Sequence, residues 1–317
     1  MGLHFYDQSP SWPSEQRGRL LEPPLAITKA GIPCVMWAED ALSIVHRVPT
    51  ALFDLQLLVP DNQVPAAVKA LCAQLPYNVI PNGDTETTRW RDTKLINPDL
   101  MLPTKEAPTR ILVHRASTFH FGINDTSRTI LNPAPPDPAF ALIRFPTITA
   151  FLDSAVDTQY EPPLPVQHYK FNQHLQMCIG YLELYTLSDQ GVQWVPDAET
   201  NEHILLPQFL QVLDTVKEEN RPSLIRDFMG LGRRGFEVSV LERRALKAAR
   251  FERLGLQYQP PAEIPYDPFA RRRGLLPQDP NSGPWQTPYL MRNKRGELFI
   301  QWRALARYTS VAIKMVR

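Results

Sequence analysis

Two polar residues interrupt an apolar run early in the chain. The run extends from Ala51 to Val59, and Asp54 and Gln56 are its only polar members. Residues two apart in a β-strand point to the same face, so these two side chains are expected to share one face. A buried carboxylate must be hydrogen-bonded, paired or bound to a metal, because burying it alone costs several kcal/mol. Asp54 is therefore the strongest single indicator of a functional site.

Further carboxylates lie near both ends of this region. Glu39 and Asp40 follow the apolar run Cys34–Trp37 after a single alanine, and Asp61 follows the longer run after a single proline. Carboxylate oxygens are the ligands that Mg²⁺ and other hard cations favour. We therefore consider Asp54, Glu39 and Asp40 as candidate catalytic residues, and Asp54 and Asp61 as candidate metal ligands.

Alternating strand and helix signals surround these residues. The expected strands are Cys34–Trp37, Ala51–Val59 and Arg110–His114, and the expected helices are Asp40–His46 and Asn62–Leu75. Strand, helix, strand, helix in this order predicts a small mixed sheet with helices packed on it. The third strand contributes His114 but no carboxylate, so it adds no acidic metal ligand.

Ala41-Leu42, His46, Pro49 and Asp54 form a pattern that continues into apolar residues up to Val59. It resembles the catalytic unit of the DNA polymerase β-like nucleotidyltransferase superfamily. In that family a strand ending in Gly-Gly leads into a helix beginning x-Ala-Leu, and a turn with His and Pro leads into a strand carrying Asp-apolar-Asp. The resemblance implies an α+β fold with a nucleotidyltransferase-like mixed sheet flanked by helices. The layout also resembles fungal proteins of nucleotidyltransferase type, which implies a fungal setting.

Two departures from the family pattern affect the expected chemistry. Ala38-Glu39 stands in place of Gly-Gly, and Gln56 replaces the second aspartate. Glycines let a backbone approach phosphate groups closely, whereas Glu39 would repel phosphate oxygens. Two-metal transfer holds two cations about 3.5–4 Å apart between several carboxylates, and a neutral amide is a poorer ligand for Mg²⁺. We expect the fold to be retained and ordinary nucleotidyl transfer to be lost.

Three hypotheses for the function follow. The first is a binding or regulatory module with a degenerate active site. The second is an enzyme of nucleotidyl or other group transfer, in which Asp54 works with Glu39 and Asp40 and Mg²⁺ is the cofactor. The third is a protein that binds tRNA or another nucleic acid. The expected partner is accordingly a nucleotide or RNA.

The charge of the chain is unevenly distributed. Residues 221–317 contain 19 Lys and Arg against 8 Asp and Glu, a net charge of about +11, and the rest of the chain has about −10. The expected helix Phe236–Leu254 has an apolar seam of Leu241, Ala245 and Ala248. Its remaining surface carries the candidate phosphate contacts Arg243, Arg244, Lys247 and Arg250. A solvated face, packing against the acidic part of the chain and contact with a polyanion are the alternatives.

A proline-rich path from Asn132 to Pro165 encloses one apolar helix, Thr147–Val156. It predicts a boundary between a nucleotidyltransferase-like domain over residues 1–145 and a mainly helical, basic region over residues 146–317. The remaining expected elements are helices at Leu20–Ala30, His203–Lys217 and Ser223–Leu231 and a strand at Glu297–Trp302.

Composition restricts the class of protein further. Cys34, Cys72 and Cys178 are widely spaced in apolar surroundings, which is typical of reduced core residues in an intracellular protein. No apolar run approaches 18 residues, so no transmembrane helix is expected. We expect a cytoplasmic or nuclear protein. Walker A, dinucleotide-binding, zinc-protease and serine-hydrolase motifs do not occur.

Overall fold

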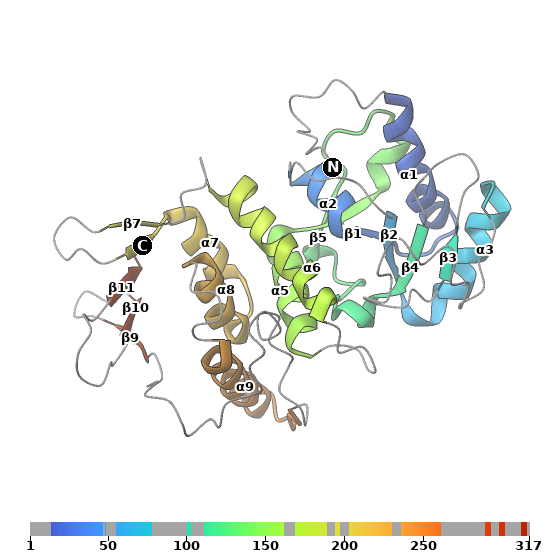
Figure 1. Ribbon diagram of the computed structural model, residues 1–317. Helices are drawn as coiled ribbons and strands as arrows, with labels where there is room; N and C mark the ends of the chain where they lie inside the picture. The colour runs from blue at the N-terminus through green and yellow to red at the C-terminus, as the bar shows by residue number, and fades with distance from the viewer. Residues whose placement is uncertain are drawn as a thin grey trace. The chain divides into compact units, whose positions relative to one another are not determined.

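The structure is a computed structural model that describes residues 14–46, 48, 55–77, 100–102, 111–161, 169–188, 194–196, 203–229, 236–260, 289–292, 298–301 and 312–315. Its contacts divide the chain into two compact units, Met1–Thr186 and Leu187–Arg317. The boundary that we predicted, between residues 145 and 146, precedes a helix that belongs to the first unit. The chain is α+β, as predicted, with a mixed sheet flanked by helices and a helical C-terminal region (Figure 1).

The first unit is built on a six-stranded sheet with strand order β3-β4-β2-β1-β6-β5. Its strands are β1 (Val35–Trp37), β2 (Leu55–Val59), β3 (Leu100–Leu102), β4 (Ile111–Arg115), β5 (Thr129–Leu131) and β6 (Arg144–Pro146). β1 runs antiparallel to β2 and parallel to β6, and β2 runs parallel to β4. The predicted pairing of the three apolar strands in one sheet is confirmed. β3 is a further strand of this sheet, beyond the three that the sequence predicts.

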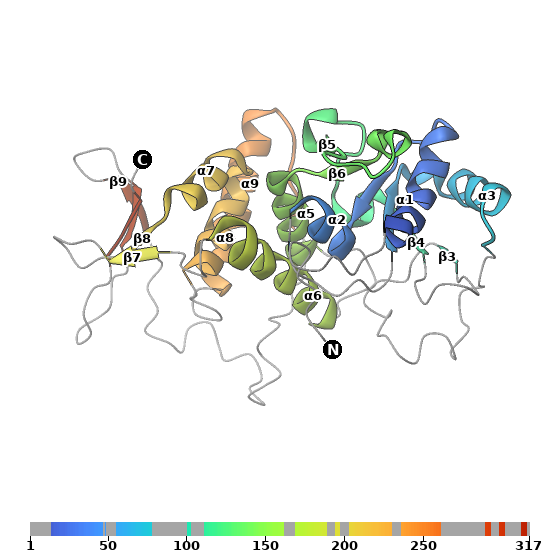
Figure 2. The same ribbon diagram turned by 90° about the horizontal axis from the view of Figure 1, so that it is seen from above.

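The two faces of this sheet carry different cores. Met36, Leu57 and Val113 belong to an aliphatic cluster with buried residues of α1 (Ser14–Lys29) and α3 (Val64–Gln74). Trp37 follows Met36 and therefore points to the other face. There its ring stacks on Phe151 with centroids 4.6 Å apart, and Phe119 and Phe121 complete the group. Figures 1 and 2 show α3 and α5 (Ile148–Tyr160) on opposite sides of the sheet.

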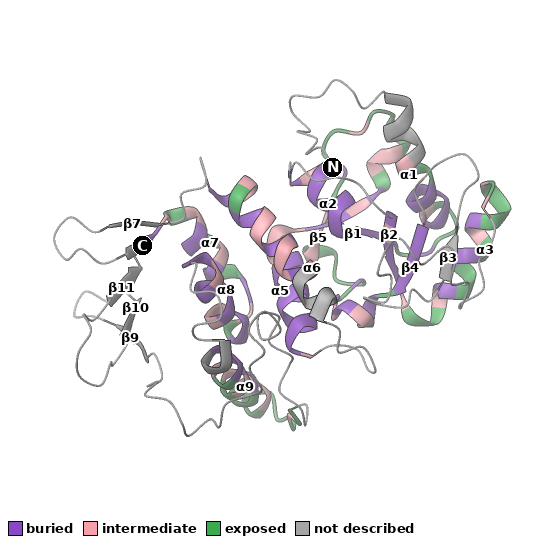
Figure 3. Cartoon of the chain, in the orientation of Figure 1, coloured by how far each residue is buried: buried purple, intermediate pink, exposed green. Residues whose placement is uncertain are grey.

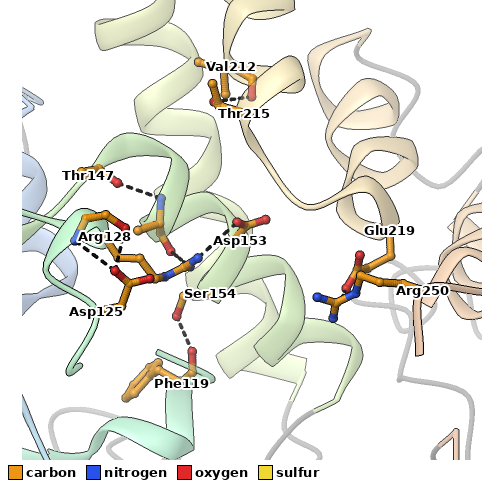
Figure 4. Close-up of polar contacts among 12 residues, drawn as sticks. Phe119, Asp125, Arg128, Thr147, Asp153, Ser154, Val212, Thr215, Glu219 and Arg250 are labelled. Carbon is orange, nitrogen blue, oxygen red and sulfur yellow. Dashed lines mark hydrogen bonds and ion pairs between the residues drawn. The ribbon is translucent and has the colours of Figure 1, made fainter. Parts of the chain in front are cut away.

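Helix α5 is buried from Ala150 to Tyr160, as Figure 3 shows by its purple ribbon. The apolar helix predicted at Thr147–Val156 is thus confirmed and extends one turn further. Thr147 caps it, because its side chain accepts a hydrogen bond from the Ala150 amide. The Ser154 hydroxyl donates to the Phe119 carbonyl, and Arg128 Nη1 lies 3.7 Å from Asp153 Oδ2 (Figure 4). These polar contacts fix α5 against the end of β4.

Several boundaries differ from the prediction. The helix expected at Leu20–Ala30 begins earlier, at Ser14, and Pro23 and Pro24 lie inside it. The hydroxyl of Thr28 donates to the Pro24 carbonyl at 2.8 Å within this helix. α2 spans Ala38–Val45, which confirms the expected helix with a start two residues earlier. A 3₁₀ turn, η1 (Asp61–Gln63), precedes α3 where we expected an N-cap.

The rest of the first unit consists of short turns and one long helical segment. The turns are η3 (Ala116–Phe119), η4 (Thr126–Arg128) and η5 (Pro138–Leu142). The helical segment is α6 (Tyr169–Tyr181), which continues without a break into the π-helix η6 (Leu182–Leu187). π-helical turns are rare and occur frequently at functional sites.

The second unit combines helices with a five-stranded sheet of order β7-β8-β11-β10-β9. Its helical elements are α7 (Pro207–Thr215), η7 (Glu218–Asn220), α8 (Arg221–Phe228) and α9 (Phe236–Arg253). Its strands are β7 (Trp194–Pro196), β8 (His203–Leu205), β9 (Tyr289–Arg292), β10 (Leu298–Gln301) and β11 (Ala312–Met315). The strand predicted at Glu297–Trp302 is confirmed as β10. Among the residues described, no helix is long and apolar enough to cross a membrane.

Two expectations for the second unit are wrong. His203 begins the strand β8, whereas we expected it to begin a helix, because residues 203–205 pair with β7 and β11. The start expected for the next helix, Ser223, lies inside α8, which begins at Arg221, and Ser223 is fully buried there. The helix predicted at Phe236–Leu254 is confirmed as α9.

Candidate functional site

The candidate site lies where β1 ends and β2 begins. Trp37 pairs with Gln56 across these antiparallel strands, so the first turn of α2 starts beside the first residues of β2. Asp54, the residue that directed attention to this region, lies outside the described residues. The described part of the site therefore consists of the side chains that surround the entry to β2.

Ala38 has a left-handed backbone at this point. Its φ is +54°, whereas the preceding Trp37 has an extended conformation. Side chains with a Cβ adopt this region at a cost of roughly 1–2 kcal/mol, and only glycine adopts it freely. The chain therefore has, at an alanine, the conformation that a glycine favours.

Ala38→Gly is expected to leave the stability nearly unchanged. The substitution relieves about 1 kcal/mol of left-handed strain, which offsets the roughly 0.5–1 kcal/mol that glycine loses through its greater freedom in the unfolded chain. Ala70→Gly, inside α3, provides the matched control and should lower the free energy of unfolding by about 1 kcal/mol. Urea unfolding of both variants followed by circular dichroism measures the difference. Equal losses in both would contradict the strain at Ala38.

Glu39 is the centre of a buried polar cluster. Its side chain belongs to the first turn of α2 and is 2% exposed. The Gln56 Nε2 atom donates to Glu39 Oε2 at 3.4 Å, and His174 Nε2 lies 3.4 Å from Glu39 Oε1. Cys178, one turn after His174 on α6, has its Sγ atom 4.0 Å from the same imidazole nitrogen. Burial raises the pKa of the Cys178 thiol well above its ordinary value, and the Glu39 carboxylate raises it further.

The two acidic residues of the first turn of α2 are both buried. Asp40 is as inaccessible as Glu39, and both are candidate catalytic residues from the sequence. Carboxylates in a first helical turn interact favourably with the positive end of the helix dipole. This placement gives both residues a role in stabilising α2, and Glu39 adds contacts to β2 and α6.

Asp61 lies beyond the opposite end of β2. The chain enters β2 directly after Asp54 and reaches Asp61 only after Val59, and a five-residue strand spans roughly 16 Å. Ser117 engages the Asp61 carboxylate through its amide at 3.2 Å and its hydroxyl at 2.5 Å. Within the residues that the structure describes, no three His, Cys, Asp or Glu side chains gather in a way that could hold a metal ion.

The basic residues of α9 make contacts with other parts of the second unit. Arg243 is 1% exposed, and its Nε atom donates to Asn220 Oδ1 at 3.0 Å. Arg250 Nη2 lies 2.7 Å from Glu219 Oε1 (Figure 4). Lys247 is buried, with its ammonium 5.1 Å from the centroid of the Tyr258 ring. The basic face of α9 is thus turned toward η7 and α8, and RNA binding through it would require these arginines to leave their partners.

The predicted apolar seam of α9 is wrong. Leu241 is 60% exposed, and Ala245 and Ala248 are also exposed. Arg244 lies beside Arg243 and is half-buried. The helix therefore buries part of its arginine-rich side, because Glu218, Glu219 and Asn220 supply partners for it.

Sequence reasoning missed two residues of the cluster around Glu39. His174 and Cys178 are four apart and share one side of α6, but the sequence analysis did not select His174 and treated Cys178 only as a core residue. Their spacing is a signal for one helical face, yet it does not indicate the partner of that face. Of the three cysteines that we expected in the core, Cys34 and Cys178 are buried and Cys72 is exposed, and all three are free thiols.

Comparison with known proteins gives little further information. No protein-family model matches the chain, and no curated protein matches it. The antibiotic-resistance factor ANT(2'')-Ia is 12% identical over 53% of this chain and 85% of that chain, with a TM-score of 0.32. JHP933 from Helicobacter pylori is 13% identical over 78% of this chain and 95% of that chain, with a TM-score of 0.29. At TM-scores this low the likeness carries no weight for the fold or the function of this chain.

Proposed function

We propose that the first unit has a nucleotidyltransferase-like fold and acts as a binding or regulatory module, without ordinary two-metal nucleotidyl transfer. The order of the elements supports this fold. β1 and β2 are antiparallel with α2 between them, and β4 joins β2 in parallel. This is the arrangement implied by the residue pattern that leads to Asp54.

The position of the Glu39 carboxylate is the observation that carries the proposal. It occupies the first turn of α2, where the family pattern has its second glycine. A phosphate brought to this turn would meet a negative charge, and two unit charges 4 Å apart repel by about 4 kcal/mol at an effective dielectric constant of about 20. The site therefore disfavours the triphosphate that a nucleotidyltransferase must hold.

The Gln56 side chain indicates that the site also disfavours the Mg²⁺ ions that nucleotidyl transfer needs. Its amide nitrogen faces Glu39 and donates a hydrogen bond to it. An amide nitrogen is a donor and offers no lone pair to a cation. Transfer chemistry that used Glu39 together with Asp54 would require Glu39 to release Gln56 and His174 first. These contacts favour a structural role for the Glu39 carboxylate over coordination of Mg²⁺.

The protein is expected to bind nucleoside triphosphates weakly or not at all. Isothermal titration of the full chain with ATP or CTP in the presence of Mg²⁺ should give no saturable heat at micromolar nucleotide, because of the repulsion at Glu39. Glu39→Gln keeps the size of the side chain and removes its charge, so it should raise the nucleotide affinity by about tenfold or more. Glu22→Gln, which removes an exposed charge on α1, is the matched control and should have no effect.

Two results would overturn the proposal. Micromolar, Mg²⁺-dependent binding by the unaltered protein would favour an active transferase that uses Asp54 with Glu39 and Asp40. Equal affinities for the Glu39→Gln and Glu22→Gln variants would show that the Glu39 charge does not govern access of phosphate to the site.

A further inference from the structure

We propose that α6 and the π-helix η6 form a strap across α2 that covers the Glu39 cluster and opens as a local unit. The strap is defined as Tyr169–Leu187. Two of its polar contacts lie at opposite ends of α2, and each of the two is made by one side chain of the strap. The inference goes beyond the proposed function, because it concerns access to the site and not the identity of its ligand.

The first attachment is at the beginning of α2. His174 of the strap lies against the Glu39 carboxylate at 3.4 Å, and Cys178 follows one turn later on the same side. Glu39 and Cys178 are almost completely buried, whereas the His174 side chain is 20% exposed. The imidazole thus forms the outer layer of the cluster, and the carboxylate and the thiol become accessible only when it moves.

The second attachment is at the end of α2. The hydroxyl of Thr186, in the π-helix, donates to the carbonyl oxygen of His46 at 2.7 Å. His46 is held in turn to the sheet, because its Nε2 atom donates to the carbonyl oxygen of Pro146 in β6 at 2.9 Å. The strap is therefore held at this end by a short hydrogen bond to a residue that is itself bonded to the sheet. At the other end it is held by the longer and weaker contact between His174 and Glu39.

The nature of these contacts favours local opening. Both contacts of Glu39 are 3.4 Å long, at the weak end of the hydrogen-bonding range. The strap also has a second neighbour, α5, to which Gln176 is joined by a hydrogen bond from Gln159 at 3.1 Å. It can separate from α2 while it stays on α5, and the sheet core around Trp37 is not disturbed. Opening would uncover Glu39 and Gln56 at the start of β2.

The three cysteines of the chain provide a test of this opening. Cys72 is exposed on α3 and reacts in every state, and Cys34 lies in the aliphatic core and reacts only when the unit unfolds. Cys178 belongs to the strap itself, on the buried side that faces Glu39, and reacts when the strap separates from α2. Its burial also keeps the thiol protonated in the closed state, which slows the reaction with an electrophile further.

The measurement is the rate of N-ethylmaleimide labelling of each cysteine in the full chain, read by peptide mass spectrometry. Cys178 should react faster than Cys34 in the unaltered protein. His174→Ala and the milder Thr186→Val each remove one attachment, and each should increase the labelling rate of Cys178 by about tenfold relative to Cys72. Neither variant should change the rate of Cys34.

A variant that destabilises the whole unit distinguishes local from global opening. Val68→Ala removes methyl groups from the aliphatic core on α3 and should raise the rate of Cys34 while leaving that of Cys178 unchanged. Rates of Cys34 and Cys178 that rise in parallel in every variant would overturn the proposal, since Cys178 would then report only unfolding. An unchanged Cys178 rate in both attachment variants would overturn it as well. Neither result depends on nucleotide binding.

Discussion

Lowering the pH from 7 to 5 should reduce the free energy of unfolding of the first unit by about 2 kcal/mol for each of two buried histidines. Burial lowers the pKa of His114 to about 4. Burial also lowers the pKa of His46 to about 4, although its hydrogen bond to the Pro146 carbonyl acts in the opposite direction. Between about pH 6.5 and 4 each of these two histidines binds a proton in the unfolded chain but not in the folded chain. Stability is therefore fully present above pH 6.5 and decreases as the pH falls through this window.

His114→Met isolates one of these two contributions. Both ring nitrogens of His114 are buried without a hydrogen-bond partner among the described residues, and its ring packs edge-on against Phe119. A methionine of similar size makes no polar demand there, so stability at pH 7 should be retained or increased. The decrease between pH 7 and 5 should shrink by about 2 kcal/mol. Hydrogen exchange of the β2 and β4 amides measures the free energy for the first unit alone.

A salt control separates burial from surface charge in this experiment. The contribution of a buried histidine should be the same at 0.1 M and 0.5 M NaCl, whereas interactions between exposed charges are screened. A pH dependence that is identical in the His114→Met variant and the unaltered protein would rule out His114 as a source of the acid sensitivity.

Arg243→Ala should lower the free energy of unfolding of the second unit by about 3 kcal/mol. This is a large loss for a charged residue in a highly charged helix. The substitution removes a completely buried side chain and leaves the Asn220 amide oxygen without its donor. Leu241→Ala, two positions earlier on the exposed side, should change the stability by no more than about 0.5 kcal/mol. Hydrogen exchange of the α9 amides provides the comparison.

The order of these two effects is the decisive result. A larger loss for Leu241→Ala would indicate that the apolar seam predicted from the sequence is buried and that Arg243 is exposed to solvent. A large loss for Arg243→Ala would show that the basic side of α9 is needed for folding. The same arginines could then contact a polyanion only at the expense of their contacts with η7.

The sequence by itself determined the centre of the first unit. The apolar runs that became β1, β2 and β4 are recognisable from their composition, and their pairing follows from a short helix between the first two strands. Strand and helix periodicity are local properties of the sequence. A central strand that is buried on both faces has few alternative pairings within the sheet. The sequence also singled out Glu39 and Gln56 separately, as departures from a residue pattern, but it did not predict that their side chains meet.

Tertiary structure decided which side of each helix is buried and which distant residue completes the site. On α9, Leu241, Ala245 and Ala248 share one side, and Arg243, Lys247 and Arg250 share another, so periodicity alone permits either side to face the protein. Glu219 and Asn220 select the basic side, because buried guanidinium groups need acceptors that only a neighbouring element can supply. In the same way, no local pattern joins Glu39 to His174, since their contact depends on how α6 crosses α2.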